Sequence, residues 1–150
     1  SGNQVLADRK FTNEMYDLVT QSLNTPLQSS ANPTQIIEQV SKPWGAVIDI
    51  QSEIDQSIAK QKLSPIATQT VTDVLEEAIT NAVKHGGAEK VWLVIKSKSS
   101  NSLKLQVKNN GAPMGKPKRE SIGTKLFNQS GIWSISNKNG LVVFKIQIDI

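Results

Sequence analysis

The sequence predicts an α+β fold, a two-layer sandwich in which helices cover one face of a mostly antiparallel, mixed sheet. Three observations predict it: a long helical pattern in mid-chain, short strand-like runs after it, and a strand-turn-strand pattern at the end. The other face of the sheet is expected to be open or lightly covered. A chain of 150 residues suits one compact domain and is short for two.

The central helix is predicted by its caps and by its apolar spacing. Ser64 is a suitable N-cap and Pro65 a suitable first helical residue, whereas Gly86 and Gly87 end the helix. Apolar side chains recur between them at helical intervals: Val71, Val74, Leu75, Ala78, Ile79 and Ala82. One face of this helix is therefore expected to pack on the sheet.

Five segments are expected to be strands. Residues 45–54 form the first, and the continuous apolar run at 91–95 is expected to be covered on both faces. Residues 103–108 alternate strictly, so one face of that strand should be buried. Residues 133–137 and 141–150 are expected to pair as a terminal hairpin around a turn at 138–140.

The remaining segments are predicted helices and loops. A helix is expected over residues 1–24, then a break over 24–33, then a short helix from residue 34 that ends at Pro43. Residues 109–121 are expected to form a loop and residues 122–129 a short helix. The chain thus divides into an N-terminal helix and linker, 1–33, and a folded domain, 34–150.

Composition narrows the classes of function. The 17 Lys and Arg give a net charge of +4 against 13 Asp and Glu, but no aromatic-and-basic motif accompanies them, so nucleic-acid binding is not expected. No apolar run approaches the ~18 residues that span a bilayer, so no membrane contact by this segment is expected. The absence of cysteine removes disulfides, thiolate metal sites and a cysteine nucleophile.

The polar face of the central helix carries the candidate site. Four side chains lie within roughly 80° of arc away from the apolar stripe: Asp73, Glu77, Asn81 and Lys84. One interpretation is a solvated face with local side-chain pairs. The other is a nucleotide and metal site, because amide and carboxylate oxygens suit Mg²⁺ and glycine turns follow at Gly111 and Gly123.

The stretch VLEEAITNAVKHGGAEKVWLVI, residues 74–95, resembles the N box of the gyrase, heat-shock chaperone, histidine kinase and MutL ATPase superfamily, called GHKL. It is most similar to the form in sensor histidine kinases of the nitrate-sensor and desaturase-sensor type. The resemblance implies a catalytic role for the N-box acid Glu77 and Mg²⁺ ligation by Asn81. It also implies positions near the phosphates for Lys84 and His85.

The resemblance continues to the end of the chain and covers roughly residues 35–150. VKNNGAPMG at 107–115 resembles the first glycine box, and SIGTKLF at 121–127 the second. It implies a Bergerat, histidine-kinase ATPase-like fold, with ATP and Mg²⁺ as cofactors. Asn109, Gly111, Gly123 and Thr124 are then the further nucleotide-binding residues.

Two positions depart from the family pattern. Asn109 stands where the first glycine box usually has the Asp that receives the adenine amino group. The Asn carbonyl can accept the same hydrogen bond, but losing the charge weakens binding by roughly 1 kcal/mol or more. Ala112-Pro113 replaces the second glycine of that box, and the expected lid, 112–121, is short.

A histidine kinase needs a phosphoacceptor histidine, and the chain has one histidine only, His85 in the N box. A structural interpretation of His85 is a helix-end residue favoured by the dipole. The segment DRKFTNEMYDLVTQSL at 8–23 resembles a phosphoacceptor helix in which Tyr16 stands in place of the histidine. The alternative is an amphipathic helix that docks on the core or on a partner.

Three functions of different classes follow. The first is the ATP-binding catalytic domain of a two-component sensor histidine kinase, which supplies the γ-phosphate to a histidine on another segment. The second is a degenerate domain that regulates by protein contact, and the third is an anti-sigma-factor type serine kinase. For the first, the resemblance implies a histidine-containing dimerisation domain and a response regulator as partners. It also implies a cytoplasmic location, including the cytoplasmic part of a membrane-bound sensor.

Overall fold

The computed structural model describes residues 29–111 and 122–150, which form two layers. One layer is a five-stranded sheet with the order β1-β2-β3-β5-β4. Its strands are β1 (Asp49–Ile54), β2 (Lys90–Ser99), β3 (Ser102–Asn109), β4 (Ile132–Lys138) and β5 (Leu141–Asp149). The other layer consists of α3 (Pro33–Ser41), the 3-10 helix η1 (Lys42–Trp44), α4 (Pro65–Lys84) and α5 (Ile122–Ser130).

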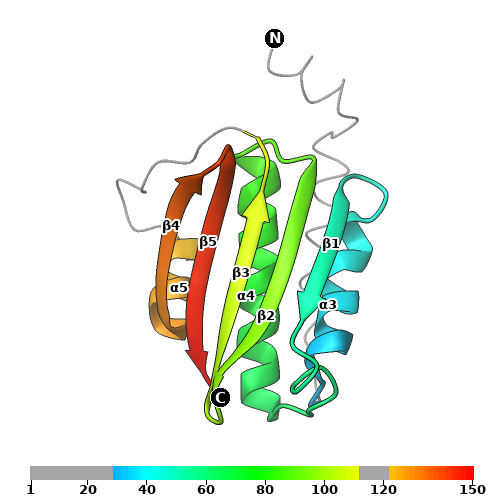
Figure 1. Ribbon diagram of the computed structural model, residues 1–150, viewed down its shortest axis with the longest axis vertical. Helices are drawn as coiled ribbons and strands as arrows, with labels where there is room; N and C mark the ends of the chain where they lie inside the picture. The colour runs from blue at the N-terminus through cyan, green and yellow to red at the C-terminus, as the bar shows by residue number, and fades with distance from the viewer. Residues whose placement is uncertain (1–28, 112–121) are drawn as a thin grey trace.

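The sheet is mixed, as expected. β1 pairs parallel with β2, and the pairs β2–β3, β3–β5 and β5–β4 are all antiparallel. The described helices lie on one side of the sheet, with α4 behind its centre, α3 behind β1 and α5 behind the β4–β5 hairpin (Figure 1). The predicted α+β two-layer sandwich is therefore confirmed.

Local sequence accounts for both ends of α4. The Ser64 side chain accepts a hydrogen bond from the Ala67 N–H at 3.1 Å, which satisfies a donor of the first turn. At the other end, the N–H of Gly87 donates to the Val83 carbonyl at 3.2 Å, and Gly87 has a φ of 60°. Glycine suits that left-handed conformation, so the double glycine ends the helix.

The α3 region differs from the prediction in its details. The α-helix ends at Ser41, and Pro43 lies within the following 3-10 turn, η1. The backbone N–H groups of Val47 and Ile48 donate to the Trp44 carbonyl, at 2.8 and 3.0 Å. These bonds hold the chain in a turn, so the strand predicted over 45–54 begins only at Asp49.

The two faces of the sheet differ in their cover. Val91, Leu93 and Ile95 of β2 are fully buried on the helical side. The prediction that residues 91–95 are covered on both faces is only partly correct. On the other side Val94 is 7% exposed, but Trp92 is only partly buried and the described helices all lie on the opposite side of the sheet. A continuous apolar run predicts a buried strand, but it does not show whether helices cover one face of that strand or both.

The terminal hairpin is confirmed. β4 and β5 pair from Ile132 with Gln147 to Lys138 with Leu141. Asn139 and Gly140, between the strands, have φ values of 53° and 76°, as a tight two-residue turn requires.

Of the described helices, none combines the length and apolarity needed to cross a bilayer. The helix predicted over 1–24 and the glycine-box residues 112–121 lie outside the described residues. So does nearly all of the predicted N-terminal part, 1–33.

Candidate functional site

The side of α4 that faces α5 carries Glu77 and Asn81, one helical turn apart. Both side chains are partly buried, so this polar face is not simply solvated. The docking of α5 explains the burial of Glu77. A Cβ added to Gly123, in the first turn of α5, would overlap the Glu77 carboxylate oxygen Oε1 and lie 2.9 Å from Cδ. With glycine here, the α5 backbone approaches that carboxylate closely, and a larger residue would require the Glu77 side chain to shift.

Asn81 faces a small cavity between α4, α5 and the sheet. Its lining comes from five elements: Ala78, Asn81, Ala82, Val107, Asn109, Phe127, Ile135, Val142 and Phe144. The cavity has a volume of about 20 Å³, which is room for about one water molecule. Two amide side chains, Asn81 and Asn109, are its polar groups, and aromatic and aliphatic side chains form the rest of its wall.

Asn109, the last residue of β3, is held firmly. Its side chain is 3% exposed, and its Nδ2 donates to the carbonyl of Asn110 at 2.6 Å. A Cβ added to Gly86 would lie 3.2 Å from that Nδ2 and 2.7 Å from the Ala82 carbonyl oxygen. The first glycine after α4 therefore makes the space that Asn109 occupies.

The end of β3 is joined to the end of α4 by backbone contact. Gly111 has a φ of 108°, and a Cβ there would overlap the carbonyl oxygen of Gly86. The neighbouring Asn110 side chain accepts hydrogen bonds from the backbone N–H groups of Glu89 and Lys90, both at 2.9 Å. These bonds fix the position of the first glycine turn relative to the polar face of α4.

The remaining predicted residues lie around the rim. Lys84 and His85 are exposed at the C-terminal end of α4, about one turn beyond Asn81, and neither lines the cavity. Thr124 is partly buried and follows Gly123 in α5. The structure thus brings Glu77 against Gly123 and Asn81 beside Asn109, whereas Lys84 and His85 lie further out.

Sequence reasoning missed the apolar wall of the cavity. Phe127 is 3% exposed, and its ring centroid lies 4.5 Å from that of Phe144 and 5.4 Å from that of Trp133. One available signal was spacing, since Phe127 stands four residues after Gly123 and so shares its side of α5. A second was the strict alternation of β5, which places Phe144 on the helical side.

Sequence reasoning also missed Glu76, which lies on another side of α4 from Glu77. Partial burial raises the pKa of its carboxyl to about 8, and the nearby Asp73 carboxylate adds to the rise. The Asp73 side chain itself accepts a hydrogen bond from Gln69 at 2.7 Å. Glu76 is therefore largely protonated near neutral pH.

Comparison with protein families finds a match over the central and C-terminal parts of the chain. The model of the family described as histidine kinase-, DNA gyrase B- and HSP90-like ATPase matches residues 67–144, just over half of the chain. A search of curated proteins finds no match.

Comparison with solved structures finds histidine kinase domains. The ATP-binding domain of PrrB from Mycobacterium tuberculosis has a TM-score of 0.62 at 20% identity, over 80% of this chain and 95% of that one. The blue-light activated histidine kinase of Erythrobacter litoralis EL346 has a TM-score of 0.62 at 14% identity, over 90% of this chain. The match spans 51% of that kinase, about half of its length. Full-length ShkA, solved with AMPPNP, has a TM-score of 0.61 at 14% identity, over 90% of this chain and 34% of ShkA. At these identities the likeness establishes the fold.

Proposed function

Because the chain belongs to the histidine kinase-, DNA gyrase B- and HSP90-like ATPase family, we propose that it is the ATP-binding catalytic domain of a two-component sensor histidine kinase. Its site lies between α4, the end of β3 and the start of α5. The observation that carries the proposal is the approach of the Gly123 backbone to the Glu77 carboxylate. It brings the segment that resembles the N box next to the segment that resembles the second glycine box, which supports a single site.

The residues present fit Mg·ATP at the phosphate end of the site. Carboxylate and amide oxygens are hard ligands, and Mg²⁺ typically uses one or two protein ligands together with substrate phosphates. Asn81 is the proposed Mg²⁺ ligand, and the backbone N–H groups around Gly123 and Thr124 are the proposed phosphate donors.

Each remaining residue has a proposed part. Asn109 accepts a hydrogen bond from the adenine amino group through Oδ1, because its Nδ2 is already bonded to Asn110. Gly111 keeps the turn beside the base close to α4. Lys84 adds positive charge at the outer rim near the phosphates, and His85 lies next to it as a polar residue of the same rim. Bound Mg·ATP supplies the phosphoryl group. Glu77 is the proposed catalytic residue, whose carboxylate orients the attacking group by accepting its hydrogen bond.

The proposed acceptor is a histidine on a separate dimerisation domain, and the proposed final acceptor is a response regulator. The position of His85 at the exposed C-terminal end of α4 supports a separate acceptor, because His85 is the only histidine in the chain. A cytoplasmic location belongs to the same proposal.

A second function, regulation through protein contact without nucleotide, is favoured by the size of the cavity. A volume of about 20 Å³ admits no adenine, so a base can enter only if Phe127 and its neighbours move. A domain in which Phe127 and its neighbours do not move would retain the fold but would not bind ATP or transfer its phosphate.

Isothermal titration calorimetry with Mg·ATP tests the first proposal against the second. We expect saturable binding that requires Mg²⁺ and that falls at least tenfold in Asn81→Ala. Thr80→Ala is the matched control, because Thr80 is the neighbouring residue on another side of α4. The absence of heat at millimolar nucleotide would support the regulatory function instead.

A second assay addresses phosphoryl transfer. The chain is mixed with γ-labelled ATP and with isolated histidine phosphoacceptor domains, and acid-labile label on the acceptor is measured. Label that depends on the chain and disappears in Glu77→Gln supports transfer to histidine. If the chain binds Mg·ATP but no label appears on the acceptor, whether linked to histidine or to serine, the function is restricted to nucleotide binding.

A further inference from the structure

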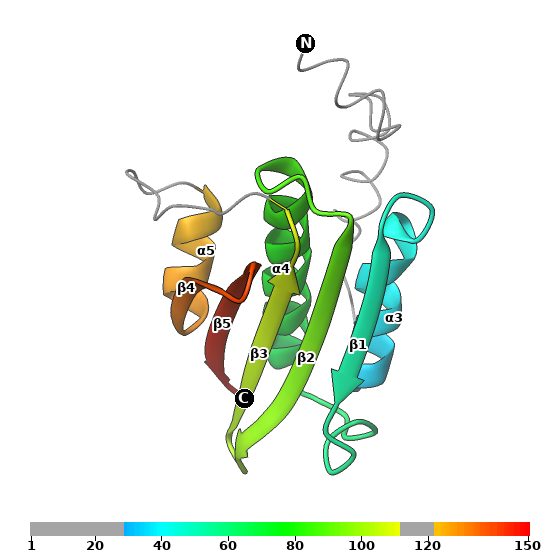
Figure 2. The ribbon, with the colours of Figure 1, turned by 45° about the horizontal axis from the view of Figure 1, so that its top comes forward.

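The sheet has a second face, which the described helices leave uncovered. Figures 1 and 2 show α3, α4 and α5 together on the opposite side. Strand pairing defines the residues of the uncovered face. One row across it runs from Gln51 through Trp92 and Lys108 to Val143, and the next runs from Glu53 through Val94 and Gln106 to Lys145.

Among the described residues, lysines gather on the uncovered face. The register and alternation place six lysines on it: Lys90, Lys96, Lys104, Lys108, Lys138 and Lys145. Three acids share the face, namely Asp49 and Glu53 on the edge strand β1 and Asp149 at the end of β5. The centre of the sheet, across β2 and β3, is therefore basic and carries no acid on this face.

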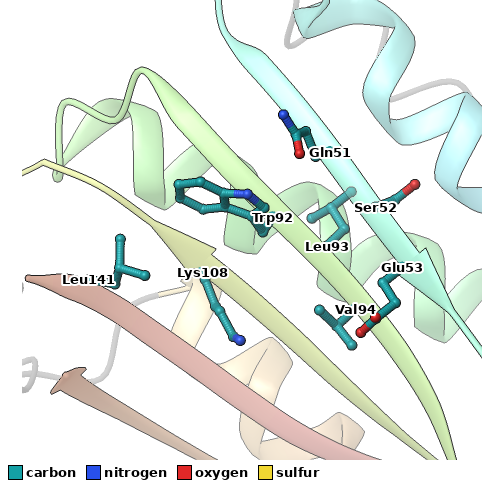
Figure 3. Close-up of a pocket in the computed structure, with 8 residues that line it drawn as sticks. All are labelled: Gln51, Ser52, Glu53, Trp92, Leu93, Val94, Lys108 and Leu141. Atoms are coloured by element: carbon teal, nitrogen blue, oxygen red, sulfur yellow. The ribbon is translucent and has the colours of Figure 1, made fainter. Parts of the chain in front are cut away.

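A groove of about 360 Å³ lies on this face, between the edge strand β1 and the basic centre of the sheet, and its charged lining residues are Glu53 and Lys108. Its lining includes Gln51 and Glu53 from β1, Trp92 and Val94 from β2, Lys108 from β3 and Leu141 from β5. Figure 3 shows the Trp92 ring at the surface, with the Lys108 side chain on the neighbouring strand β3 and Leu141 on the strand beyond it, β5. Trp92 is only partly buried, so an apolar surface is available at the centre of a cationic one.

We infer that this groove binds an acidic peptide segment of a partner protein, which places an apolar side chain against Trp92 and Val94 and carboxylates beside Lys108 and Lys145. Charge complementarity selects this occupant. The inference concerns the face of the sheet opposite the nucleotide site and does not depend on nucleotide binding.

Two other occupants fit the face less well. A second copy of the chain, placed face to face, would bring two sets of lysines together. Single-stranded nucleic acid is usually bound by successive aromatic side chains on which bases stack. Trp92 is the single aromatic residue on this face within the described ranges, because Trp44 is buried and Trp133 packs against Phe127.

An array of 12-residue peptides tests the inference. Each peptide is made in three versions that share one apolar anchor pattern and differ in having Glu, Gln or Lys at the other positions. We expect wild-type protein to be retained on the Glu versions at least about fivefold more than on the Gln versions. Retention that ignores peptide charge overturns the inference.

Variants that reverse or remove a single positive charge locate the binding. We expect Lys108→Glu to lower retention on the Glu peptides about fivefold, and Lys145→Gln, at an exposed position, to lower it about twofold. Lys62→Glu is the matched control, because Lys62 is exposed in the segment before α4 and should leave retention unchanged. An equal loss in Lys62→Glu would show non-specific charge attraction and overturn the inference.

A final arm uses the same proteins with a 12-nucleotide thymidine strand. We expect the Trp92 indole signal in a proton–nitrogen spectrum to shift with the best Glu peptide and not with the nucleic acid. A shift with the nucleic acid alone would assign the face to nucleic-acid binding and contradict the peptide assignment.

Discussion

The backbone of Gly123 in α5 lies directly against the carboxylate of Glu77 in α4, close enough that no Cβ fits between them. This approach places the start of one helix, whose dipole favours negative charge, beside an acid of another. The same corner of the fold contains Asn81, Asn109 and the cavity that they line. Predictions for the site follow from this arrangement.

Gly123→Ala should lower the affinity for Mg·ATP about tenfold. The new Cβ would displace the Glu77 carboxylate and occupy the space where the backbone is proposed to meet phosphate. The free energy of unfolding should change by less than about 1 kcal/mol, since Glu77 is a flexible side chain and alanine favours helix. Calorimetry and urea unfolding measure the two effects.

The matched control is Gly45→Ala, where the nearest atom to a Cβ is the Lys42 carbonyl oxygen at 3.7 Å, an ordinary contact. This variant should bind Mg·ATP as the wild type does. If both variants bind Mg·ATP with wild-type affinity, the Gly123 backbone is not part of the phosphate site.

Phe127→Ala should lower the free energy of unfolding by about 3 kcal/mol. Phe127 is 3% exposed and packs on Phe144 and Trp133, so removing its ring leaves a hole between α5 and the hairpin. Gln129→Ala, at an exposed position two residues on, should change stability by less than about 0.5 kcal/mol. Urea unfolding followed by tryptophan fluorescence measures both, and a loss below about 1 kcal/mol for Phe127→Ala would show that α5 is loosely docked.

Glu76 should make the protein less stable as the pH rises from 4.5 toward 8. Burial raises its pKa from 4.5 to about 8, so the folded state holds the proton more tightly than the unfolded state does. The resulting stability is present below pH 4.5 and is lost as the pH rises through the folded pKa. Because the side chain is partly exposed, solvent screening limits the loss to about 1–2 kcal/mol.

Thermal unfolding between pH 5 and 9 measures this effect. Glu76→Gln should match the wild type near pH 5 and exceed its stability at pH 8 and above. Glu38→Gln, at an exposed position of α3, is the control and should follow the wild type throughout. Parallel curves for wild type and Glu76→Gln would show that Glu76 ionises in the folded state as it does in water.

Asn109→Asp should strengthen ATP binding and weaken the fold. A carboxylate accepts the adenine amino group with a charge-assisted bond, which should raise the affinity about fivefold. The same carboxylate cannot donate to the Asn110 carbonyl, so a buried hydrogen bond of 2.6 Å is lost and stability should fall by about 1–2 kcal/mol. Competition with GTP, which lacks that amino group, measures specificity; equal gains for ATP and GTP would contradict the assigned contact.

Local signals predicted α4 and the hairpin well. The cap at Ser64, the double glycine and the apolar spacing all lie within or beside the helix, and Asn139-Gly140 lies within its own turn. Glu77 and Asn81 could be identified as motif residues for the same reason, because they lie four residues apart in one helix.

Features that depend on packing between segments far apart in the chain could not be predicted from the sequence. The contact of Gly111 with Gly86 joins the ends of β3 and α4, and the near-closure of the cavity depends on how Phe127 meets Phe144 across two elements. The raised pKa of Glu76 likewise comes from burial, which its position in the sequence did not reveal. The continuous apolar run at 91–95 predicted a buried strand, but it did not show that the face of β2 carrying Trp92 lacks a covering helix.

A proton–nitrogen correlation spectrum of the chain, titrated with Mg²⁺ and a non-hydrolysable ATP analogue, shows directly whether nucleotide binds between α4, β3 and α5. We expect saturable shifts of the Gly123 and Gly111 backbone signals and of the Asn81 and Asn109 side-chain amides, with the Trp92 indole unmoved. Saturable shifts of signals from another surface, with these four signals unchanged, would contradict nucleotide binding at this site.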